Sequence, residues 1–203
     1  MSARGRKEGG ARSTFMAAAL FGTGMASIMK TVIYGAACSL DGFIAGLDDG
    51  VDWLKWSDEV AALSAGTFAT VDTVVMGRRT YEVALRLGTR SYPGVRNIVF
   101  SKTLASDRYE EVEVIADDAV SVVREMRQEA GPGICVMGGG RLAASLLAAD
   151  LVDEIGVNVH PILLGKGIPF LAHVTRRIDL ERIACRPLQH GCVYAYYRVI
   201  RSD

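Results

Sequence analysis

The sequence predicts one α/β domain of three layers, in which a mixed, mostly parallel sheet of about eight strands lies between helices and ends in an antiparallel hairpin. Three observations support this prediction. Short apolar runs alternate with amphipathic helical patterns between residues 31 and 160. Two alternating segments, 178–186 and 192–200, flank the turn sequence PLQHG near the end of the chain. The 203 residues are 50% hydrophobic, which suits a single continuous core.

The elements are expected in the following order. Strands are predicted over residues 31–38, 71–77, 96–101, 112–116, 133–138 and 152–160, and helices over 57–69, 78–87, 117–131 and 140–150. Ser57 and Asp117 are placed to cap two of these helices. The strand, helix and strand of residues 133–160 predict a βαβ unit with a parallel strand pair. A long loop rich in Gly and Asp, residues 39–54, follows the first strand, and loops of this length usually have a function.

The first residues differ in composition from the rest of the chain. Four basic residues precede a short apolar run at 15–21, as in a weak signal peptide: Arg4, Arg6, Lys7 and Arg12. The other interpretation is an upstream start codon, because Met25 and Met29 stand just before the ordered pattern KTVIYGAACS. We interpret residues 1–29 as a disordered or non-native extension and residues 30–203 as the domain.

Composition argues against several partners. The formal net charge is zero, so no overall field attracts nucleic acid or an anionic membrane, and no segment after residue 30 reaches the 18 apolar residues of a membrane span. The four cysteines are scattered in apolar segments, which favours a cytoplasmic location: Cys38, Cys135, Cys185 and Cys192. Cys185, His190 and Cys192 lack a fourth ligand nearby, so we expect no metal site.

Two loops predict a phosphate site. In CVMGGGRLAASLL, residues 135–147, the glycines Gly138, Gly139 and Gly140 join a strand to a helix, whose first N–H groups favour an anion. In VVMGRRTYE, Gly77 joins another strand to a helix beginning with Arg78, Arg79 and Thr80. Arginine supplies forked donors to phosphate, and two cations at a helix start are unfavourable without an anion. Together the two helix starts could bracket a pyrophosphate.

Each motif has a plainer interpretation. The triple glycine can be a tight turn that lets a helix and a sheet pack closely. Its letters also fit a dinucleotide fingerprint, but the next strand ends in Asn158 and His160 where an acidic residue would be needed. Ser101, Lys102 and Thr103 form either an ordinary turn after a strand or a site for a 2′-phosphate.

A family resemblance rests on five segments in order: SLDGFIA, VVMGRRTYE, IVFSKT, VMGGGRLAASLLAADLVDEI and HPILLGKGIPF. This order is similar to that of the dihydrofolate reductase-like superfamily. The chain most resembles the reductase domain of riboflavin biosynthesis and its bacterial single-domain relatives. The likeness covers about residues 30 to 200, and the GGGR helix and the PILLGKGIPF segment are its most specific parts.

The resemblance implies that NADPH lies across the carboxyl ends of the strands. The residues it implies for the cofactor are Ala37, Ile44, Gly77, Arg78, Thr80, Ser101, Lys102, Gly138, Gly139, Gly140 and Arg141. Of these, Ala37 and Ile44 would flank the nicotinamide, and Ser101 and Lys102 would lie near the 2′-phosphate. The resemblance also implies a cis peptide between adjacent glycines of the triple-glycine loop.

The resemblance implies a substrate site beside the helix that begins near Ser57. Asp58 stands where folate reductases carry the carboxylate that assists protonation, although a helix N-terminal acid has the same sequence signal. Asp41, Trp53 and Lys166 are the candidates for contacts to substrate. A lone histidine at a strand end, His160, is expected to be a hydrogen-bonded structural residue.

We therefore expect an NADPH-dependent reductase that transfers a hydride to a small heterocyclic substrate, of the riboflavin-pathway type. Two alternatives stay open at this point: a true dihydrofolate reductase, and a nucleotide-binding module without turnover. The closing hairpin carries Tyr194, Tyr196 and Tyr197, which are typical of either a homodimer surface or core packing.

Overall fold

The computed structural model describes residues 29–105 and 109–201. Apart from Met29, the expected extension of residues 1–29 lies outside this range. The domain predicted from residue 30 begins with strand β1 at Thr31.

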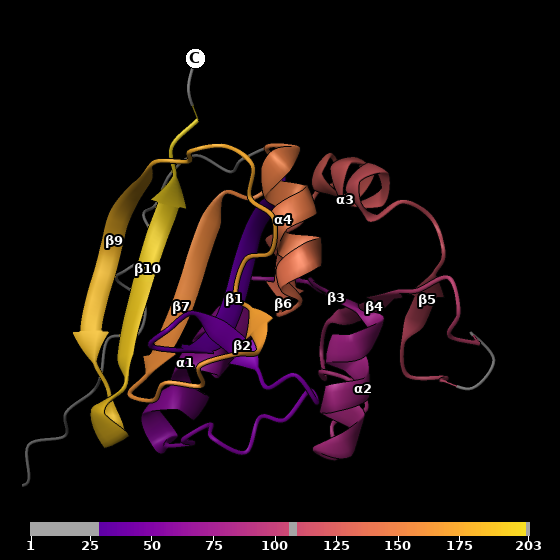
Figure 1. The fold of residues 1–203 in the computed structure, drawn as a ribbon. Helices are drawn as coiled ribbons and strands as arrows, with labels where there is room; N and C mark the ends of the chain where they lie inside the picture. The colour runs from indigo at the N-terminus through magenta and orange to yellow at the C-terminus, as the bar shows by residue number, and fades with distance from the viewer. Residues whose placement is uncertain (1–28, 106–108, 202–203) are drawn as a thin grey trace, which may run out of the picture.

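The main sheet has eight strands in the order β5-β4-β3-β6-β1-β7-β10-β9 (Figure 1). Their bounds are β1 Thr31–Ser39, β3 Thr73–Gly77, β4 Arg96–Phe100, β5 Glu113–Ile115, β6 Gly133–Met137, β7 Glu154–His160, β9 Leu180–Pro187 and β10 Val193–Val199. The six strands from β5 to β7 pair in parallel, and β10 pairs antiparallel with β7 and with β9. The predicted fold class, a mostly parallel sheet closed by an antiparallel hairpin, is confirmed.

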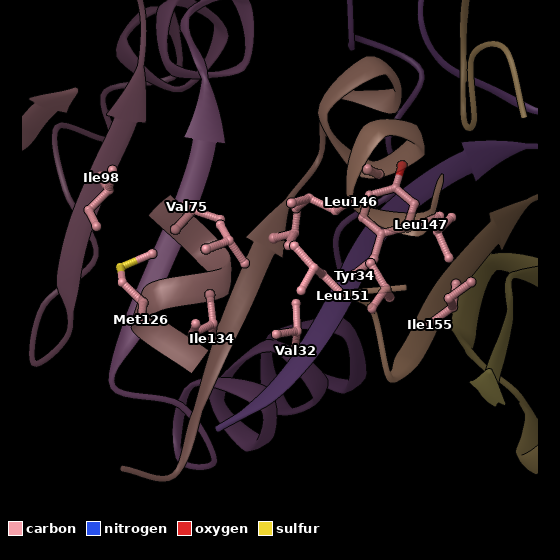
Figure 2. Packing of buried hydrophobic residues seen from close by; sticks show 14 residues of the cluster. Val32, Tyr34, Val75, Ile98, Met126, Ile134, Leu146, Leu147, Leu151 and Ile155 are labelled. Atoms are coloured by element: carbon pink, nitrogen blue, oxygen red, sulfur yellow. The ribbon is translucent and has the colours of Figure 1, made fainter. Parts of the chain in front are cut away.

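In the described part of the chain, four α-helices flank the sheet in two layers: α1 Asp58–Phe68, α2 Arg78–Arg86, α3 Ala119–Arg127 and α4 Gly140–Ala148. α3 and α4 cover one face, where Leu146 and Leu147 of α4 pack against strand residues such as Val32 and Ile134 (Figure 2). Alternate strand residues point to the opposite face. There Ile33 and Met76 pack with Tyr81 of α2, and Phe68 of α1 borders the same cluster.

Two details of the predicted topology are wrong. β6 and β7 are parallel but do not pair, because β1 lies between them and pairs with both. The crossover through α4 therefore passes over one strand. Asp118, not Asp117, caps α3: its carboxylate accepts from the N–H of Ser121, and the helix starts at Ala119. The cap of α1 is Ser57, as predicted.

A second, two-stranded sheet joins distant loops. β2 (Phe43–Ala45), within the long loop after β1, pairs with β8 (Ile168–Pro169). The contact is close, since a methyl group added at Gly167 would lie 2.3 Å from the carbonyl oxygen of Ala45. The LGKGIPF segment thus lies directly against the loop that follows β1.

The closing hairpin packs partly in the core. Tyr196 is buried in the same cluster as Ile33 and Met76, and Tyr194 packs against that cluster. The hydroxyl of Tyr196 donates to the carboxylate of Glu154 on β7. Core packing accounts for these two tyrosines. Across residues 29–105 and 109–201, no helix is both long and apolar enough to span a bilayer.

Replacing Leu146 with Ala tests the packing of α4 on the sheet. Leu146 has no exposed surface and belongs to the larger of the two buried clusters. The loss of a buried leucine side chain is expected to lower the free energy of unfolding by about 2–5 kcal/mol. Urea denaturation followed by circular dichroism measures this change. Ser145→Ala, at the exposed neighbouring position of α4, serves as the control and should change stability by less than about 0.5 kcal/mol.

Candidate functional site

The predicted cofactor residues lie at one edge of the sheet. Strands β4, β3, β6 and β1 run in parallel, so their carboxyl ends meet at this edge. The residues that follow these strand ends include Ser101, Gly138 and Asp41 in loops and Arg78 at the start of α2. The fold therefore brings together segments that are far apart in the sequence.

The triple-glycine loop turns through two residues of left-handed conformation. Gly138 has φ 56° and Gly139 has φ 76°, values that favour glycine. The N–H of Gly138 donates to the carbonyl of Gly35 on the neighbouring β1. The cis peptide that the resemblance implied is not present among the described residues. The expectation was wrong because the two left-handed glycines make the turn with trans peptides.

Gly140 allows a close approach between α4 and the segment after β8. A methyl group at this position would lie 2.2 Å from the carbonyl oxygen of Pro169 and 2.8 Å from that of Phe170. The N–H of Ala172 also donates to the carbonyl of Gly140. The plainer interpretation of this glycine, close packing, is therefore correct at Gly140, whereas Gly138 and Gly139 shape the loop itself.

The starts of α2 and α4 lie side by side. Thr80 contacts the glycine loop: a methyl group at Gly139 would lie 3.3 Å from its hydroxyl oxygen. Neither helix has a side-chain cap, since glycines occupy both N-cap positions. Uncapped N–H groups at two adjacent helix starts are suited to a doubly charged anion. The residues present thus fit the pyrophosphate of a dinucleotide.

The three arginines near these helix starts have different partners. Arg78 donates to the hydroxyl of Thr103 at 2.9 Å and lies 3.6 Å from the carboxylate of Glu82, and it is largely exposed. Arg79 forms a two-point ion pair with Asp49 in the loop after β1. Arg141 is exposed on α4. Arg79 therefore holds the loop, while Arg78 and Arg141 are placed to meet an anion.

Ser101 and Lys102 line an open concave surface at the ends of β4 and β5. Asp117 and Asp118 line the same surface. The hydroxyl of Ser101 accepts from the N–H groups of Thr103 and Leu104, so it also stabilises the turn. Lys102 is exposed. The arrangement keeps one cation and one hydroxyl at the place predicted for the 2′-phosphate.

The structure places Asp41 in a structural role. Its carboxylate accepts from the hydroxyl of Ser39 and from the N–H groups of Leu164 and Gly165. The hydrogen bond from Ser39, aided by these backbone donors, lowers the pKa of Asp41 below its usual value. Asp41 thereby joins the turn after β1 to the segment carrying Lys166, whose side chain is exposed.

Three more predicted residues lie on the elements that border this edge of the sheet. Asp58 is the exposed first residue of α1, where an acid is favoured by the helix dipole. Ala37 and Ile44 are half-buried at the end of β1 and in β2. The assignment of Asp58 as catalytic stays a prediction.

A buried polar cluster lies at the end of β7, and His160 is its centre. The N–H of Lys55 donates to Nδ1 of His160 at 3.2 Å, and the sulfur of Cys192 lies 3.5 Å from the same nitrogen. The ring of Trp53 packs edge-on against the imidazole, with centroids 5.3 Å apart, and the amide of Asn158 lies 3.1 Å from Nε2. The structural role expected for His160 is confirmed. Burial, together with the charge of Lys55, lowers its pKa.

Two residues of the strand-end region, Asn158 and Asp49, were not predicted as site residues. Asn158 was considered only as a strand-end residue that is not acidic. Its alternation with apolar residues is typical of a strand with one side in water, so it carried no local signal of burial. Asp49 gave no such signal in a loop rich in Asp. Within residues 29–105 and 109–201, no three His, Cys, Asp or Glu side chains gather as a metal site.

The sheet and its closing hairpin identify the fold class of the protein. An eight-stranded, mostly parallel sheet with this closing hairpin is the dihydrofolate reductase-like fold, shared with dihydrofolate reductase from Enterococcus faecalis (TM-score 0.60, 20% identity, 83% of this chain and 96% of that one). The chain belongs to the RibD C-terminal domain family, which matches residues 30–193. It is thus a member of a riboflavin-pathway reductase family.

Two further similarities are consistent with membership of this family. A structure from Shewanella sp. PV-4, provisionally described as a riboflavin biosynthesis protein, has a TM-score of 0.73 and 25% identity over 84% of this chain and 99% of that one. The Bacillus subtilis (strain 168) protein YwjB is 35% identical over 155 residues, 75% of this chain and 88% of its own, and is itself uncharacterized. The family is shown by these matches, whereas the substrate is not.

A matched pair of glycine variants tests the close approach at α4. Gly140→Ala places a methyl group against two backbone carbonyls, which cannot rotate away, and should lower the free energy of unfolding by about 1–3 kcal/mol. In Gly77→Ala the added methyl group meets no atom within 4 Å. Because Ala is a poorer N-cap residue than Gly, this variant should lower the free energy of unfolding by at most about 1 kcal/mol. Urea denaturation compares the two. Equal losses would contradict the packing role of Gly140.

The buried imidazole predicts a pH dependence of stability. The pKa of His160 is lowered in the folded state, so the protein keeps it neutral where the unfolded chain binds a proton. Above the unfolded-state pKa of about 6.5 the imidazole is neutral in both states and does not affect stability. As the pH falls below about 6.5, the free energy of unfolding declines with a slope that approaches about 1.4 kcal/mol per pH unit. Urea denaturation between pH 7.5 and 5 measures the slope. His160→Gln should remove this component, and an unchanged slope in that variant would contradict the assignment.

Proposed function

We propose that the protein is an NADPH-dependent reductase that transfers a hydride to a small heterocycle of the pyrimidine or pteridine type. The family membership supports a reductase of the riboflavin pathway. A protein of the same fold from Thermotoga maritima is described as a 5-amino-6-(5-phosphoribosylamino)uracil reductase joined to a deaminase, and this chain spans 57% of it (TM-score 0.63, 16% identity). The substrate class proposed here follows that description.

One observation carries the cofactor assignment. The uncapped starts of α2 and α4 lie in contact through Thr80 and the glycine loop, at the ends of the adjacent strands β3 and β6. The N–H groups of these first turns would bind the pyrophosphate, and Gly138 and Gly139 leave their backbone uncovered by side chains. Arg141, next to the loop, would add a charge-assisted hydrogen bond.

The preference for NADPH over NADH would come from the next loop along the sheet edge. Arg78 reaches Thr103 in the turn after β4, and Lys102 is exposed in the same turn. Both cations would face a 2′-phosphate that NADH lacks. Asp117 lines the same surface and would oppose that phosphate, so the preference depends on Arg78 and Lys102 outweighing it.

When bound, the nicotinamide supplies the hydride, and this chain contributes positioning and electrostatics. Ala37 and Ile44 border the place where the ring would lie, at the end of β1 and in β2. The segment before α1 is fixed by the hydrogen bond from Lys55 to His160. Asp58 begins the helix that follows and is the proposed source of the proton.

A second function is favoured by the position of Asp58. Because this carboxylate is exposed rather than held in the buried cluster, the chain could bind the nucleotide without turnover. Absorbance at 340 nm discriminates the two functions: saturable loss of NADPH that depends on a heterocyclic substrate supports the reductase. A stable NADPH complex that no such heterocycle oxidises would support the binding module.

Calorimetric titration of the purified protein with NADPH and NADH tests the cofactor site. NADPH should bind more tightly than NADH, and Arg78→Ala should weaken NADPH binding by about 1.5–3 kcal/mol because a charged hydrogen bond to phosphate is lost. The same variant should change NADH binding far less.

Arg177→Ala is the control for that titration. Arg177 is an exposed arginine paired with Asp179 before β9, away from the strand ends of the site, so its loss should leave both affinities unchanged. Absence of binding by either nucleotide would overturn the cofactor assignment. Equal affinity for NADPH and NADH, unaffected by Arg78→Ala, would overturn the role of Arg78.

A further inference from the structure

Asp49, in the loop between β2 and α1, is held by two arginines of α2. Its carboxylate accepts two hydrogen bonds from the guanidinium of Arg79, one from Nη2 at 2.6 Å and one from Nε at 3.2 Å. Its carbonyl oxygen accepts a third from Arg86, two turns further along the helix, at 3.2 Å. Asp49 has φ 63°, in the left-handed region that is unfavourable for a residue with a side chain. The contacts with α2 therefore help to maintain this conformation.

These contacts hold the middle of a strap that is fixed at both ends. The strap, residues 46–54, lies between β2, which pairs with β8, and Lys55, whose N–H donates to His160. Two backbone hydrogen bonds close a turn at residues 46–50 within it. Because this turn meets α2 through Asp49, its attachment to the helix depends on the partners of that residue.

Arg79 belongs to the proposed pyrophosphate site as well as to this ion pair. It is the second residue of α2, and its N–H is one of the uncapped donors at the helix start. The Cα–Cβ bond of a helical residue is tilted toward the N-terminal end of the helix, so the side chain of Arg79 extends from that end. Thr80, the next residue, would lie 3.3 Å from a methyl group at Gly139. The long side chain of Arg79 can thus reach an anion bound between the two helix starts.

The ion pair is weak enough to be exchanged for a phosphate. The side chain of Arg79 is 54% exposed and that of Asp49 is 24% exposed, and ion pairs open to solvent contribute little to stability. A pyrophosphate carries more negative charge than a carboxylate, and it can accept from the guanidinium and from the backbone N–H groups of the helix together. Pyrophosphate is therefore the stronger ligand for Arg79.

We propose that Asp49 is an internal competitor of the cofactor: its carboxylate occupies Arg79 until the pyrophosphate displaces it, and the displacement frees the middle of the strap. This inference rests on the proposed function, because it concerns the anion that the two helix starts would bind. The contact restrains the affinity for nucleotide and links the anion site to the segment before α1. Both tryptophans of the chain, Trp53 and Trp56, lie in that segment.

Inorganic pyrophosphate is the probe, used in calorimetric titrations at constant ionic strength. Asp49→Asn removes the negative charge, and asparagine tolerates the left-handed conformation as aspartate does, so the backbone strain is unchanged. This variant should bind pyrophosphate about threefold more tightly than wild type, the size expected when an exposed competing ion pair is lost.

Asp48→Asn is the matched control. It removes the same charge from the exposed neighbouring position, where the carboxylate accepts from the N–H of Gly50. Because salt screens exposed charges, its affinity for pyrophosphate should differ from wild type by less than about 1.5-fold. An equal gain in Asp48→Asn and Asp49→Asn would assign the effect to the charge of the loop as a whole and overturn the inference.

Arg79→Gln shows whether the effect of Asp49 passes through the exchanged cation. This variant alone should bind pyrophosphate more weakly than wild type, because a charged ligand is lost. Adding Asp49→Asn to it should then bring no gain, since the carboxylate no longer has a cation for which to compete. The same gain with and without Arg79 would contradict the proposed competition.

Tryptophan emission reports the strap itself. Pyrophosphate neither absorbs nor emits in this range, so a change of emission on binding reports the segment that carries Trp53 and Trp56. Wild type should show a saturable change, whereas Asp49→Asn should start near the emission of the loaded wild type and change less. Binding of pyrophosphate with no change in wild-type emission would overturn the release of the strap.

The outcomes separate this inference from the proposed function. If wild type and Asp49→Asn bind both NADPH and pyrophosphate equally well, the cofactor site stands and the competition fails. If pyrophosphate competes with Asp49 as expected but neither NADPH nor NADH binds, the anion site and its competitor stand and the reductase function fails. If wild type binds none of the three, both proposals fail.

Discussion

The close approach of α4 to the segment after β8 is the constraint on which the site depends. At Gly140 the helix backbone lies so near the carbonyls of Pro169 and Phe170 that no side chain fits between them. Phe170 donates its N–H to the carbonyl of Gly42 in the loop after β1, and the hydroxyl of Tyr34 donates to the carbonyl of Phe170. Three loops are therefore fixed by main-chain contacts, and the helix start that faces the anion has a defined position.

Because the backbone builds this part of the site, several polar side chains hold the loops that surround it. Asp41 is occupied by Ser39 and two backbone N–H groups, and Arg79 by Asp49. Lys102 and Arg141 are left exposed at the strand ends, with Asp117 and Asp118 beside Lys102. A neutral chain can bind an anion in this way, since loop-holding pairs neutralise one another and local cations remain.

The elements themselves could be predicted from the sequence, because apolar periodicity and glycines at strand ends are local signals. The strand order could not, since nothing local to residues 133–160 shows that β1 inserts between β6 and β7. The cap of α3 was misplaced by one residue because Asp117 and Asp118 carry the same local signal. The sequence predicted that two helix starts could bracket an anion, but not the contact between Thr80 and the glycine loop or the partners of Arg79 and Asp41.

The pattern of β7 explains why the polar cluster was hard to find. In EIGVNVH, residues 154, 156, 158 and 160 point to one face, and their alternation with apolar residues is typical of a strand with one side in water. The segment before α1 covers this face instead: the ring of Trp53 and the N–H of Lys55 contact His160, and Asn158 and His160 are both buried. This long-range packing turns an apparently solvated pattern into buried polar groups, each of which must find a partner. A polar residue in a strand is therefore informative about function only after the elements that cover its face are known.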